Sequence, residues 1–295
     1  MDDTFEHSDA FDALSDPTRI AIVEALVAAR REDPEQPTLS FSALRDRVDV
    51  DDSGRFNYHL QKLRDRFVEK SDAGYELNYA GRQVAAAILA GTLDEAEALD
   101  PVSLDDPCPI CDVPMAVEYE SGQLTVTCEC AHRLFQTPVP PAAAVGRTVT
   151  ELLDFALDLT HGRLMLHTRE VCPECYATIE NGVSMLTFND SEFYALVSTC
   201  GRCGMQSTSS LGISLLHDPD LATFYRDHGI DVRDAHPWLL GIVQAPAEEI
   251  ASDPPRYRIA CTVDGETFEA TLDDAGQVLE TRRTDAEPAA DQSVH

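Results

Sequence analysis

Apolar positions in the first third of the chain recur at helical spacing and are separated by short polar breaks. Residues 10–31 predict two helices, because Asp16-Pro17 interrupts the run and proline suits the first position of a helix. A polar linker that contains proline follows over residues 32–37. The next three apolar positions predict a short helix: Phe41, Leu44 and Val48.

A capped amphipathic helix is predicted over residues 54–64, where Asp51-Asp52-Ser53 supplies N-cap candidates. Its apolar stripe lies at positions i, i+4 and i+7, which are Phe56, Leu60 and Leu63. The face turned away from this stripe is mostly polar: Gly54, Arg55, Tyr58, Gln61 and Lys62. Residues 68–77 then predict two short strands around Ala73-Gly74, and residues 79–93 predict another amphipathic helix.

This order of elements predicts a winged helix-turn-helix. Ser15-Asp16-Pro17-Thr18-Arg19, followed by an apolar helix, resembles the N-terminal signature of ArsR-type winged-helix repressors. Asn57-Tyr58-His59-Leu60-Gln61-Lys62-Leu63 resembles their recognition helix, where Ser-x-His-Leu-x-x-Leu is common. The chain departs from that pattern at Asn57, where Ser is usual, and at Phe67-Val68, where Gly-Leu leads into the wing.

The nine cysteines all follow residue 107 and form two sets of four, with Cys261 left over. The first set is Cys108, Cys111, Cys128 and Cys130, and the second is Cys172, Cys175, Cys200 and Cys203. A C-x2-C pair places two thiolates on one tight turn, and two such turns joined by a hairpin make a tetrahedral site that suits zinc. Alternating segments predict these hairpins: 115–120 with 123–127, and 183–188 with 193–199 around a turn at 189–191.

Each set therefore predicts a zinc-ribbon-like module with one structural Zn²⁺, two per chain. The first set is less regular because Cys128-x-Cys130 is a shorter pair, and His132 could replace one thiolate of the preferred four cysteines. Four-sulfur iron uses the same geometry. Disulfides or free buried cysteines would also account for the pattern, although disulfides are disfavoured in a cytosolic chain. We expect Cys261 to be a buried small apolar residue in a strand.

Together with the remaining segments, these elements predict the α+β fold class. A winged helix-turn-helix precedes two zinc-ribbon-like modules and a small C-terminal β-rich region. Residues 148–160 predict an amphipathic helix, and residues 163–167 a strand. The predicted C-terminal strands lie at 257–263, 266–272 and 278–282, and we expect them to share a core with the second ribbon. The predicted domains are 1–93, 94–147 and 148–284, followed by a disordered acidic tail at 285–295.

The cysteine-rich part is similar to a group of haloarchaeal regulators that append cysteine-rich domains to a winged helix. The matching pieces are the Cys-Pro-x-Cys turns and the stretch Phe224-Tyr225-Arg226-Asp227-His228-Gly229-Ile230-Asp231-Val232. This resemblance implies the architecture more than a function.

Acidic residues far outnumber basic ones, with 53 Asp and Glu against 22 Lys and Arg and a net charge of −31. Only Lys62 and Lys70 are lysines. Such a surface repels itself at low ionic strength, but at 1 M salt the screening length falls to about 3 Å. We therefore interpret the composition as adaptation to high salt. Because the chain has no long apolar run and residues 1–12 lack a signal peptide's features, we expect a soluble, cytoplasmic protein without a membrane partner.

The charge is unevenly distributed, since residues 1–92 carry a net −7 and residues 93–295 a net −24. Within residues 42–66, six basic groups accompany five acidic groups, which makes this segment the least acidic part of the chain. The overall charge therefore does not exclude a nucleic-acid partner.

These observations predict a sequence-specific DNA-binding transcription regulator whose helix 53–63, starting at Ser53, enters the major groove of double-stranded DNA. Arg55 is expected to pair with guanine, and Gln61 or Asn57 with adenine. Phosphate or sugar contacts are expected from four further side chains: Arg45, Tyr58, Lys62 and Arg64. The alternative is that these are solvated helix positions. We expect His59, beside the apolar stripe, to pack or cap rather than to contact a base.

ArsR-like proteins usually dimerise through terminal helices, which implies a homodimer formed here by residues 5–14 and 79–93. Two further functions stay open: a zinc-ribbon adaptor that acts through protein contacts, and a sensor of a metal or another effector. The sensor cysteines of ArsR relatives lie in the helix before the recognition helix, and residues 41–48 contain none. An enzyme is not expected, because common catalytic motifs are missing and both cysteine sets look closed.

Overall fold

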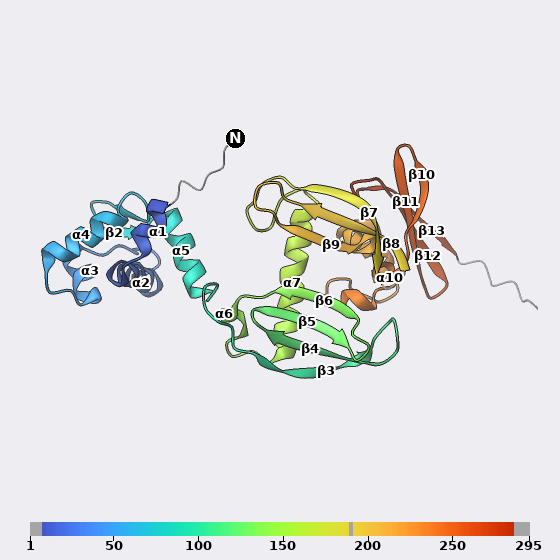
Figure 1. Cartoon of the computed structure of the whole chain (residues 1–295), viewed down its shortest axis with the longest axis horizontal. Coiled ribbons are helices and arrows are strands. Elements are labelled where there is room, and N and C mark those ends of the chain that lie inside the picture. Colours follow the sequence, from blue (N-terminus) through green and yellow to red (C-terminus); the bar gives the residue numbers. More distant parts are fainter. Residues whose placement is uncertain (1–7, 189–190, 286–295) are drawn as a thin grey trace, which may run out of the picture. The chain divides into compact units, whose positions relative to one another are not determined.

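A computed structural model of the chain describes residues 8–188 and 191–285 (Figure 1). The chain divides into two units. The N-terminal unit runs to Glu97 and includes Pro140–Val145, and the C-terminal unit holds Ala98–Val139 and the chain from Gly146 onward. The predicted turn at 189–190 and the predicted tail beyond Asp285 lie outside the described residues. None of the described helices has both the length and the apolar character that a membrane crossing requires.

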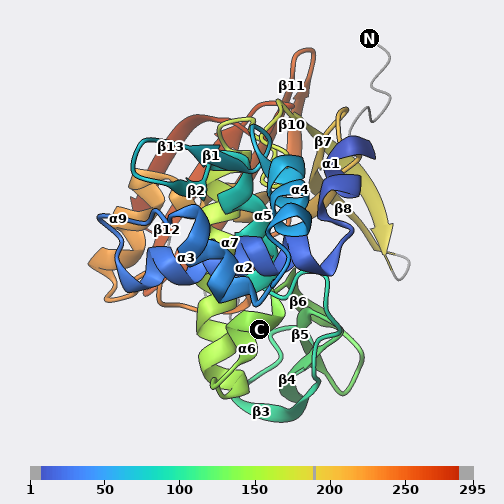
Figure 2. The same ribbon diagram turned by 90° about the vertical axis from the view of Figure 1, so that its left-hand side faces the viewer.

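The N-terminal unit is built from helices and one short hairpin (Figure 2). Its helices are α1 (Ser8–Leu14), α2 (Pro17–Glu32), α3 (Phe41–Val48), α4 (Ser53–Leu63), α5 (Tyr79–Leu89) and α6 (Pro141–Ala144). Its strands β1 (Val68–Lys70) and β2 (Tyr75–Leu77) pair antiparallel. These bounds confirm the predicted elements, except that the helix predicted over residues 79–93 ends at Leu89. At the predicted break, Asp16 caps α2 by accepting a hydrogen bond from the Thr18 amide at 2.8 Å.

A single apolar core holds these elements together. It includes Ile22 and Leu26 of α2, Leu44 of α3, and the predicted stripe of α4, all of which are at most 1% exposed. Burying one such side chain contributes about 1.5–3 kcal/mol, so this unit needs no metal to form a core. Gly74 is required in the hairpin turn, because a Cβ there would lie 2.4 Å from the Leu39 carbonyl oxygen.

The end of α4 is formed by a tight turn at Asp65, without a glycine. Asp65 adopts the left-handed conformation, with φ of 66°, which aspartate tolerates better than most residues. The Asp65 amide donates to the Val68 carbonyl at 2.9 Å, and Phe67 donates to Leu63 at 2.9 Å. This turn ends α4 and directs the chain into β1.

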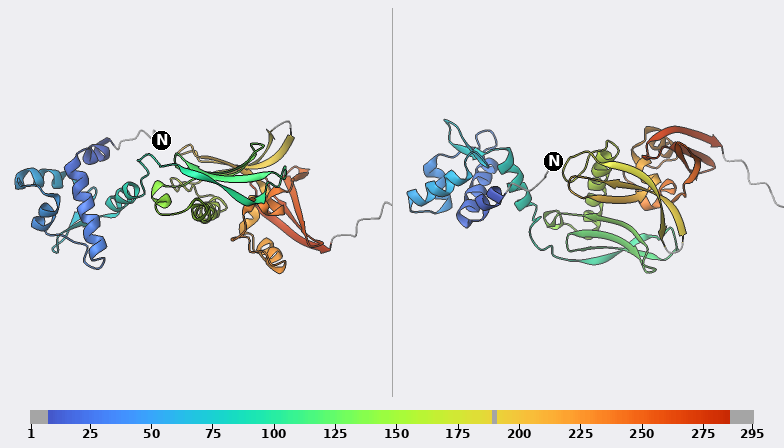
Figure 3. Two further views of the ribbon diagram at one scale, coloured as in Figure 1. Left: turned by 90° about the horizontal axis from the view of Figure 1, so that it is seen from below. Right: turned by 45° about the horizontal axis from the view of Figure 1, so that its top comes forward.

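The first sheet of the C-terminal unit packs against one long helix (Figure 3). Its strands run in the order β3 (Leu99–Pro107), β4 (Pro114–Glu120), β5 (Gln123–Cys128) and β6 (Arg133–Pro138), all antiparallel. The predicted β4–β5 hairpin is confirmed, with Ser121 and Gly122 both at positive φ in its turn. The flanking strands β3 and β6 were not predicted.

The helix against this sheet is α7 (Val149–His167), and it corrects one prediction. Thr148 and Glu151 form a capping box at its start, as the pattern over residues 148–160 suggested. The strand predicted at 163–167 is wrong, because α7 continues through these residues to His167. Leu164 lies seven residues after the buried Leu157 and therefore stays on the packed side of the helix. A short apolar run such as 163–167 fits a buried helix segment as well as a strand, so the pattern alone could not decide between them.

The rest of the C-terminal unit combines two sheets with short helices. The three-stranded sheet contains β7 (Glu180–Phe188), β8 (Ser191–Thr199) and β9 (Gln206–Ser210), and the four-stranded sheet contains β10 (Glu248–Ser252), β11 (Pro255–Val263), β12 (Glu266–Leu272) and β13 (Val278–Asp285). The helical segments are α8 (Leu211–Ser214), η1 (Leu215–His217), α9 (Pro219–Asp227), η2 (Pro237–Leu239) and α10 (Gly241–Gln244).

One core joins these parts, as the sequence suggested for the second ribbon and the C-terminal strands. Leu196 of β8, Phe224 of α9 and Phe268 of β12 belong to it, and Leu164 of α7 packs against it. Cys261 is also a member and is 7% exposed, which confirms the prediction of a buried cysteine in a strand. Its neighbour is the Tyr225 hydroxyl at 3.6 Å, and burial raises the pKa of the Cys261 thiol.

Candidate metal centres and nucleic-acid interface

The second predicted cysteine set converges on one point. The Sγ atoms of Cys172, Cys175, Cys200 and Cys203 all lie within 4.8 Å of one another. The Sγ atoms of Cys172 and Cys203 are 3.6 Å apart, and those of Cys175 and Cys200 are 3.5 Å apart. Four thiols at these separations match the tetrahedral sulfur set that holds structural zinc. The group can hold a metal ion.

The two turns that carry these thiols share one backbone pattern. The amide of the first cysteine donates to a carbonyl five residues on, from Cys172 to Ala177 at 2.8 Å and from Cys200 to Met205 at 2.9 Å. The residue after the second cysteine is left-handed in both turns: Tyr176 has φ of 59° and Gly204 has φ of 77°. Amides of Cys203 and Arg202 also point at Cys200 Sγ and lower the pKa of this thiol to about 6. The second turn therefore favours a thiolate at Cys200, the form that binds metal, whereas burial and the neighbouring thiols raise the pKa of Cys175 and Cys203.

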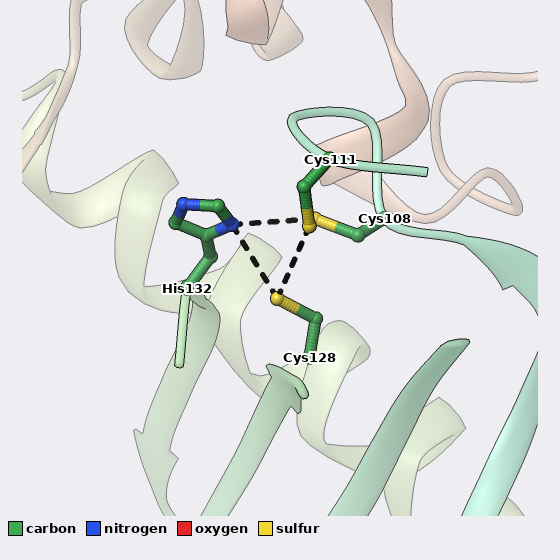
Figure 4. A group of neighbouring side chains, drawn as sticks. All are labelled: Cys108, Cys111, Cys128 and His132. Carbon is green, nitrogen blue, oxygen red and sulfur yellow. Dashed lines mark hydrogen bonds between the residues drawn. The ribbon is translucent and has the colours of Figure 1, made fainter. Parts of the chain in front are cut away.

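The first cluster contains three cysteines and one histidine (Figure 4). Its ligand atoms come from Cys108, Cys111, Cys128 and His132, and all lie within 4.8 Å of one another. His132 Nδ1 lies 3.4 Å from Cys128 Sγ and 3.8 Å from Cys108 Sγ, and Cys111 Sγ lies 3.6 Å from Cys128 Sγ. Desolvation opposes ionisation of Cys128, but hydrogen bonds from the His132 and Cys130 amides and from neighbouring thiols lower its pKa to about 7.

The structure therefore places His132, and not Cys130, in the first group, which corrects the preferred set of four cysteines. The reason lies in the length of the turn. Cys128 donates to a carbonyl only four residues on, that of His132 at 3.1 Å, whereas Cys108 donates five residues on, to Val113 at 2.9 Å. With one residue fewer in the turn, Cys130 is exposed and stays outside the group, although its thiol still interacts with that of Cys111. The His132 side chain, at the end of the shortened turn, supplies the fourth ligand atom.

The predicted nucleic-acid face lies on α4 and is open to solvent. Five of the predicted side chains are exposed: Ser53, Arg55, Asn57, Tyr58 and Gln61. Lys62 is exposed too, and its Nζ lies 5.7 Å from the centre of the Tyr58 ring. The start of α4 is fixed by Asp52, whose carboxylate accepts hydrogen bonds from the amides of Gly54 and Arg55 at 2.8 and 3.2 Å. A rigid helix therefore presents these groups on one side while its apolar stripe is buried.

Three other residues lie near this face with partners of their own. Arg64 is half-buried and donates to the Gln61 side chain at 3.2 Å, and Arg45 of α3 is half-buried and donates to Asp46 at 3.3 Å. His59 is buried, with its Nδ1 3.4 Å from the carboxylate of Asp16. The packed position of His59 agrees with the expectation that it faces the core.

Sequence reasoning missed one polar grouping. His161 of α7 and His217 of η1 are far apart in the chain, yet their rings meet edge to face with centroids 5.4 Å apart. His217 Nε2 also lies 3.1 Å from the carbonyl oxygen of His161. The histidines lack any metal-ligand spacing in the sequence, so only the packing of η1 on α7 brings them together.

Comparison with known families gives two matches. Residues 7–88 match the family described as a domain of unknown function, DUF7347. Residues 105–278 match the family described as a domain of unknown function, DUF7351. No curated protein and no solved structure matches the chain. Because the second match covers more than half of the sequence and contains both cysteine groups, the chain belongs to the DUF7351 family.

Proposed function

We propose that the protein is a sequence-specific DNA-binding transcription regulator, in which the N-terminal unit is an ArsR-like winged helix-turn-helix. The observation that carries this proposal is the outward face of α4. Arg55, Gln61 and Lys62 are exposed on a helix whose opposite face is fully buried. Among the described residues, no side chain pairs with the Arg55 guanidinium. It is therefore available for a bidentate bond to guanine.

The neighbouring elements suit the same role. In such proteins the second helix of the helix-turn-helix pair enters the major groove, and here α3 and α4 make up that pair. The β1–β2 hairpin takes the place of the wing. Arg45 at the end of α3 and Lys62 in the last turn of α4 are placed for phosphate contacts, which set the position of a protein on the duplex.

High salt determines how such an interface gains its affinity. Counterion release favours phosphate contacts at low salt, and this contribution falls steeply as salt rises. A protein with a net charge of −31 that works in molar salt must therefore depend more on base-edge contacts and on shape. A homodimer doubles these contacts. Exposed apolar side chains on the two helices implied in dimerisation support this assembly: Phe11 on α1, and Tyr79 and Leu89 on α5.

The two cysteine groups are proposed to hold structural zinc ions rather than to sense metal. Cys172 and Cys200 belong to a small buried cluster with Ile179, Cys175 packs against it, and Cys203 is exposed. A closed four-ligand site leaves no open position. Within the described residues, α3 contains no cysteine or histidine that would serve a sensor site before α4.

The test begins with a genome-wide binding map at native salt, which identifies a duplex for fluorescence anisotropy. The double variant Arg55→Ala plus Gln61→Ala should weaken binding to this duplex by about 2 kcal/mol or more, roughly thirtyfold, because two base contacts are lost. Its matched control is Arg30→Ala plus Gln36→Ala, which removes the same two residue types from exposed positions outside α4. Unchanged affinity of the α4 variant at the mapped site would reject the groove assignment.

The same experiment separates a regulator from a zinc-ribbon adaptor. The adaptor function draws support from Ile110 and Tyr176, apolar side chains that are 57% and 74% exposed on the cysteine turns. An adaptor would be recruited by another protein, so purified chain would show no site preference in the anisotropy assay. Crosslinking to chromatin would then depend on Tyr176 and not on Arg55.

A further inference from the structure

A cavity of about 230 Å³ lies in the C-terminal unit. It is bounded by the end of α7, the three-stranded sheet, η1 and the loop between β12 and β13. Its apolar wall is formed by Leu164, Leu196, Ile213 and Val278. None of the predicted metal ligands or α4 residues lines it, so it is distinct from both sites described above.

Polar groups without an internal partner face the same cavity. No described residue makes a hydrogen bond to the side chains of Ser209 or Gln277, or to the ring of His167, and all three line the cavity. His167 is only 9% exposed. Burial, and then the nearby Arg163, lower its pKa, so its imidazole is neutral and offers one donor and one acceptor.

His217 adds a further free ring nitrogen. Its Nε2 lies 3.1 Å from the His161 carbonyl oxygen, which fixes the ring against α7 and leaves Nδ1 without a partner among the described residues. The His161 ring packs edge to face on His217, and both of its nitrogens are buried with no partner among the described residues. Both histidines thus have ring nitrogens without a partner among the described residues, and of the two His217 lines the cavity.

The walls of the cavity are fixed in place. Asn181 donates to the His167 carbonyl at 3.1 Å and accepts from the buried Ser198 hydroxyl at 2.7 Å. The loop over the cavity is tied to β7 by the Val183 amide, which donates to the Asp274 carbonyl at 2.7 Å. Gly276 is required in this loop, because a Cβ there would lie 2.7 Å from a methyl carbon of Leu196. Ligand pockets are usually preformed in this way.

We propose that this cavity binds a small uncharged molecule that has an apolar edge and both hydrogen-bond donors and acceptors, the class to which nucleobases and aromatic amides belong. The volume lies below the 300–1,000 Å³ typical of drug-sized ligands, so about one ring system fits. No lysine or arginine lines the cavity to balance an anion. Its carboxylate, Asp218, already caps α9 by accepting from the amides of Asp220 and Leu221.

The test is direct binding to the full chain without DNA, so its outcome does not depend on the proposed regulator function. Saturation-transfer NMR with adenine, uracil and nicotinamide, each at about 1 mM, detects affinities in the range expected for such fragments. We expect at least one of them to bind the wild-type chain. Benzoate, an anion of similar size, should bind at least tenfold more weakly than the best neutral probe.

Two variants locate the binding. Ser209→Trp fills the cavity and should abolish the signal, whereas Ser184→Trp makes the same change at an exposed position of β7 and should leave it intact. Because a tryptophan can also disturb folding, Gln277→Ala serves as a second variant that removes only an unpaired amide and should weaken binding at least threefold. The proposal is overturned if no neutral probe binds, if benzoate binds best, or if binding is the same in wild-type, Ser209→Trp and Gln277→Ala chains.

Discussion

The N-terminal unit encloses Ile22, Leu26, Phe56 and Leu60 in one core and contains no cysteine, whereas the C-terminal unit contains all nine. In the C-terminal unit, two cysteines of the second group, Cys172 and Cys200, are buried with little apolar support beyond Ile179 and its neighbours Ala177 and Met205. A small element without enough core depends on bound metal for its stability. Metal loss should therefore affect one unit and leave the other folded.

The two cysteine groups also differ from each other, in the length of their turns and in their ligands. The second group joins two turns of equal length and is made of four thiols, whereas the first joins a full-length turn to a shortened one and recruits His132. The exchange of a thiolate for a neutral imidazole also lowers the negative charge of the site by one. Both groups suit zinc. The exposed cysteine of the second group, Cys203, is one of its four ligands, whereas the exposed Cys130 lies beside the first group.

The largest expected effect is that of metal removal. Structural zinc contributes on the order of 10 kcal/mol to the folding of small metal-binding elements, so a strong chelator should unfold the parts of the C-terminal unit around both groups. Amides of α2 and α4 should stay protected, because the core of the N-terminal unit contains no metal ligand. Hydrogen exchange followed by mass spectrometry, with metal content measured on the same sample, checks this result. Equal loss of protection in both units would show that the N-terminal core also depends on metal.

The reciprocal change is Phe56→Ala in α4. Phe56 is 0% exposed and packs edge to face on Phe41 at 5.1 Å between ring centroids, so its truncation should cost about 3–5 kcal/mol. The N-terminal unit should melt at a lower temperature while the chain keeps two metal ions. Calorimetry and metal analysis together check this. The exposed Tyr58→Ala serves as the control and should leave the melting temperature nearly unchanged.

Within the C-terminal unit, His132→Ala and Cys130→Ala compare the two candidate fourth ligands. Loss of His132 opens the first site and should weaken metal binding there by a hundredfold or more, equivalent to about 3 kcal/mol. Cys130→Ala should change the affinity less than threefold, because its thiol lies outside the group. Competition with a chromogenic chelator measures both affinities. The reverse ranking would restore the four-cysteine set.

The sequence predicted those features that are encoded within a few neighbouring residues. The stripe of α4, the break at Asp16-Pro17 and the β4–β5 hairpin each lie within a few residues, and each was predicted. The flanking strands β3 and β6 were not, because an edge strand such as β3 is largely exposed and carries no clear alternation. The fourth ligand of the first group, His132, was named only as the alternative to the preferred Cys130, since the choice depends on the backbone of one shortened turn.

The cavity and the His161–His217 pair were beyond sequence reasoning altogether. They require η1 and the β12–β13 loop to pack against α7 and β8, and these segments are distant in the chain. Such a site arises from tertiary packing, and the spacing of its residues in the sequence does not predict it.

The smallest expected effect concerns the cap of α4, and it tests whether the proposed interface is held by local rather than metal-dependent structure. Asp52→Ala removes the carboxylate that accepts from the Gly54 and Arg55 amides, so the N-terminal unit should lose about 1 kcal/mol of stability. Asp52→Asn keeps an accepting oxygen and should lose only a fraction of this. Denaturant unfolding followed by near-ultraviolet circular dichroism of the metal-loaded chain measures the difference. If Asp52→Ala instead released metal, folding of the two units would be coupled, and the metal sites would no longer be separable from the stability of α4.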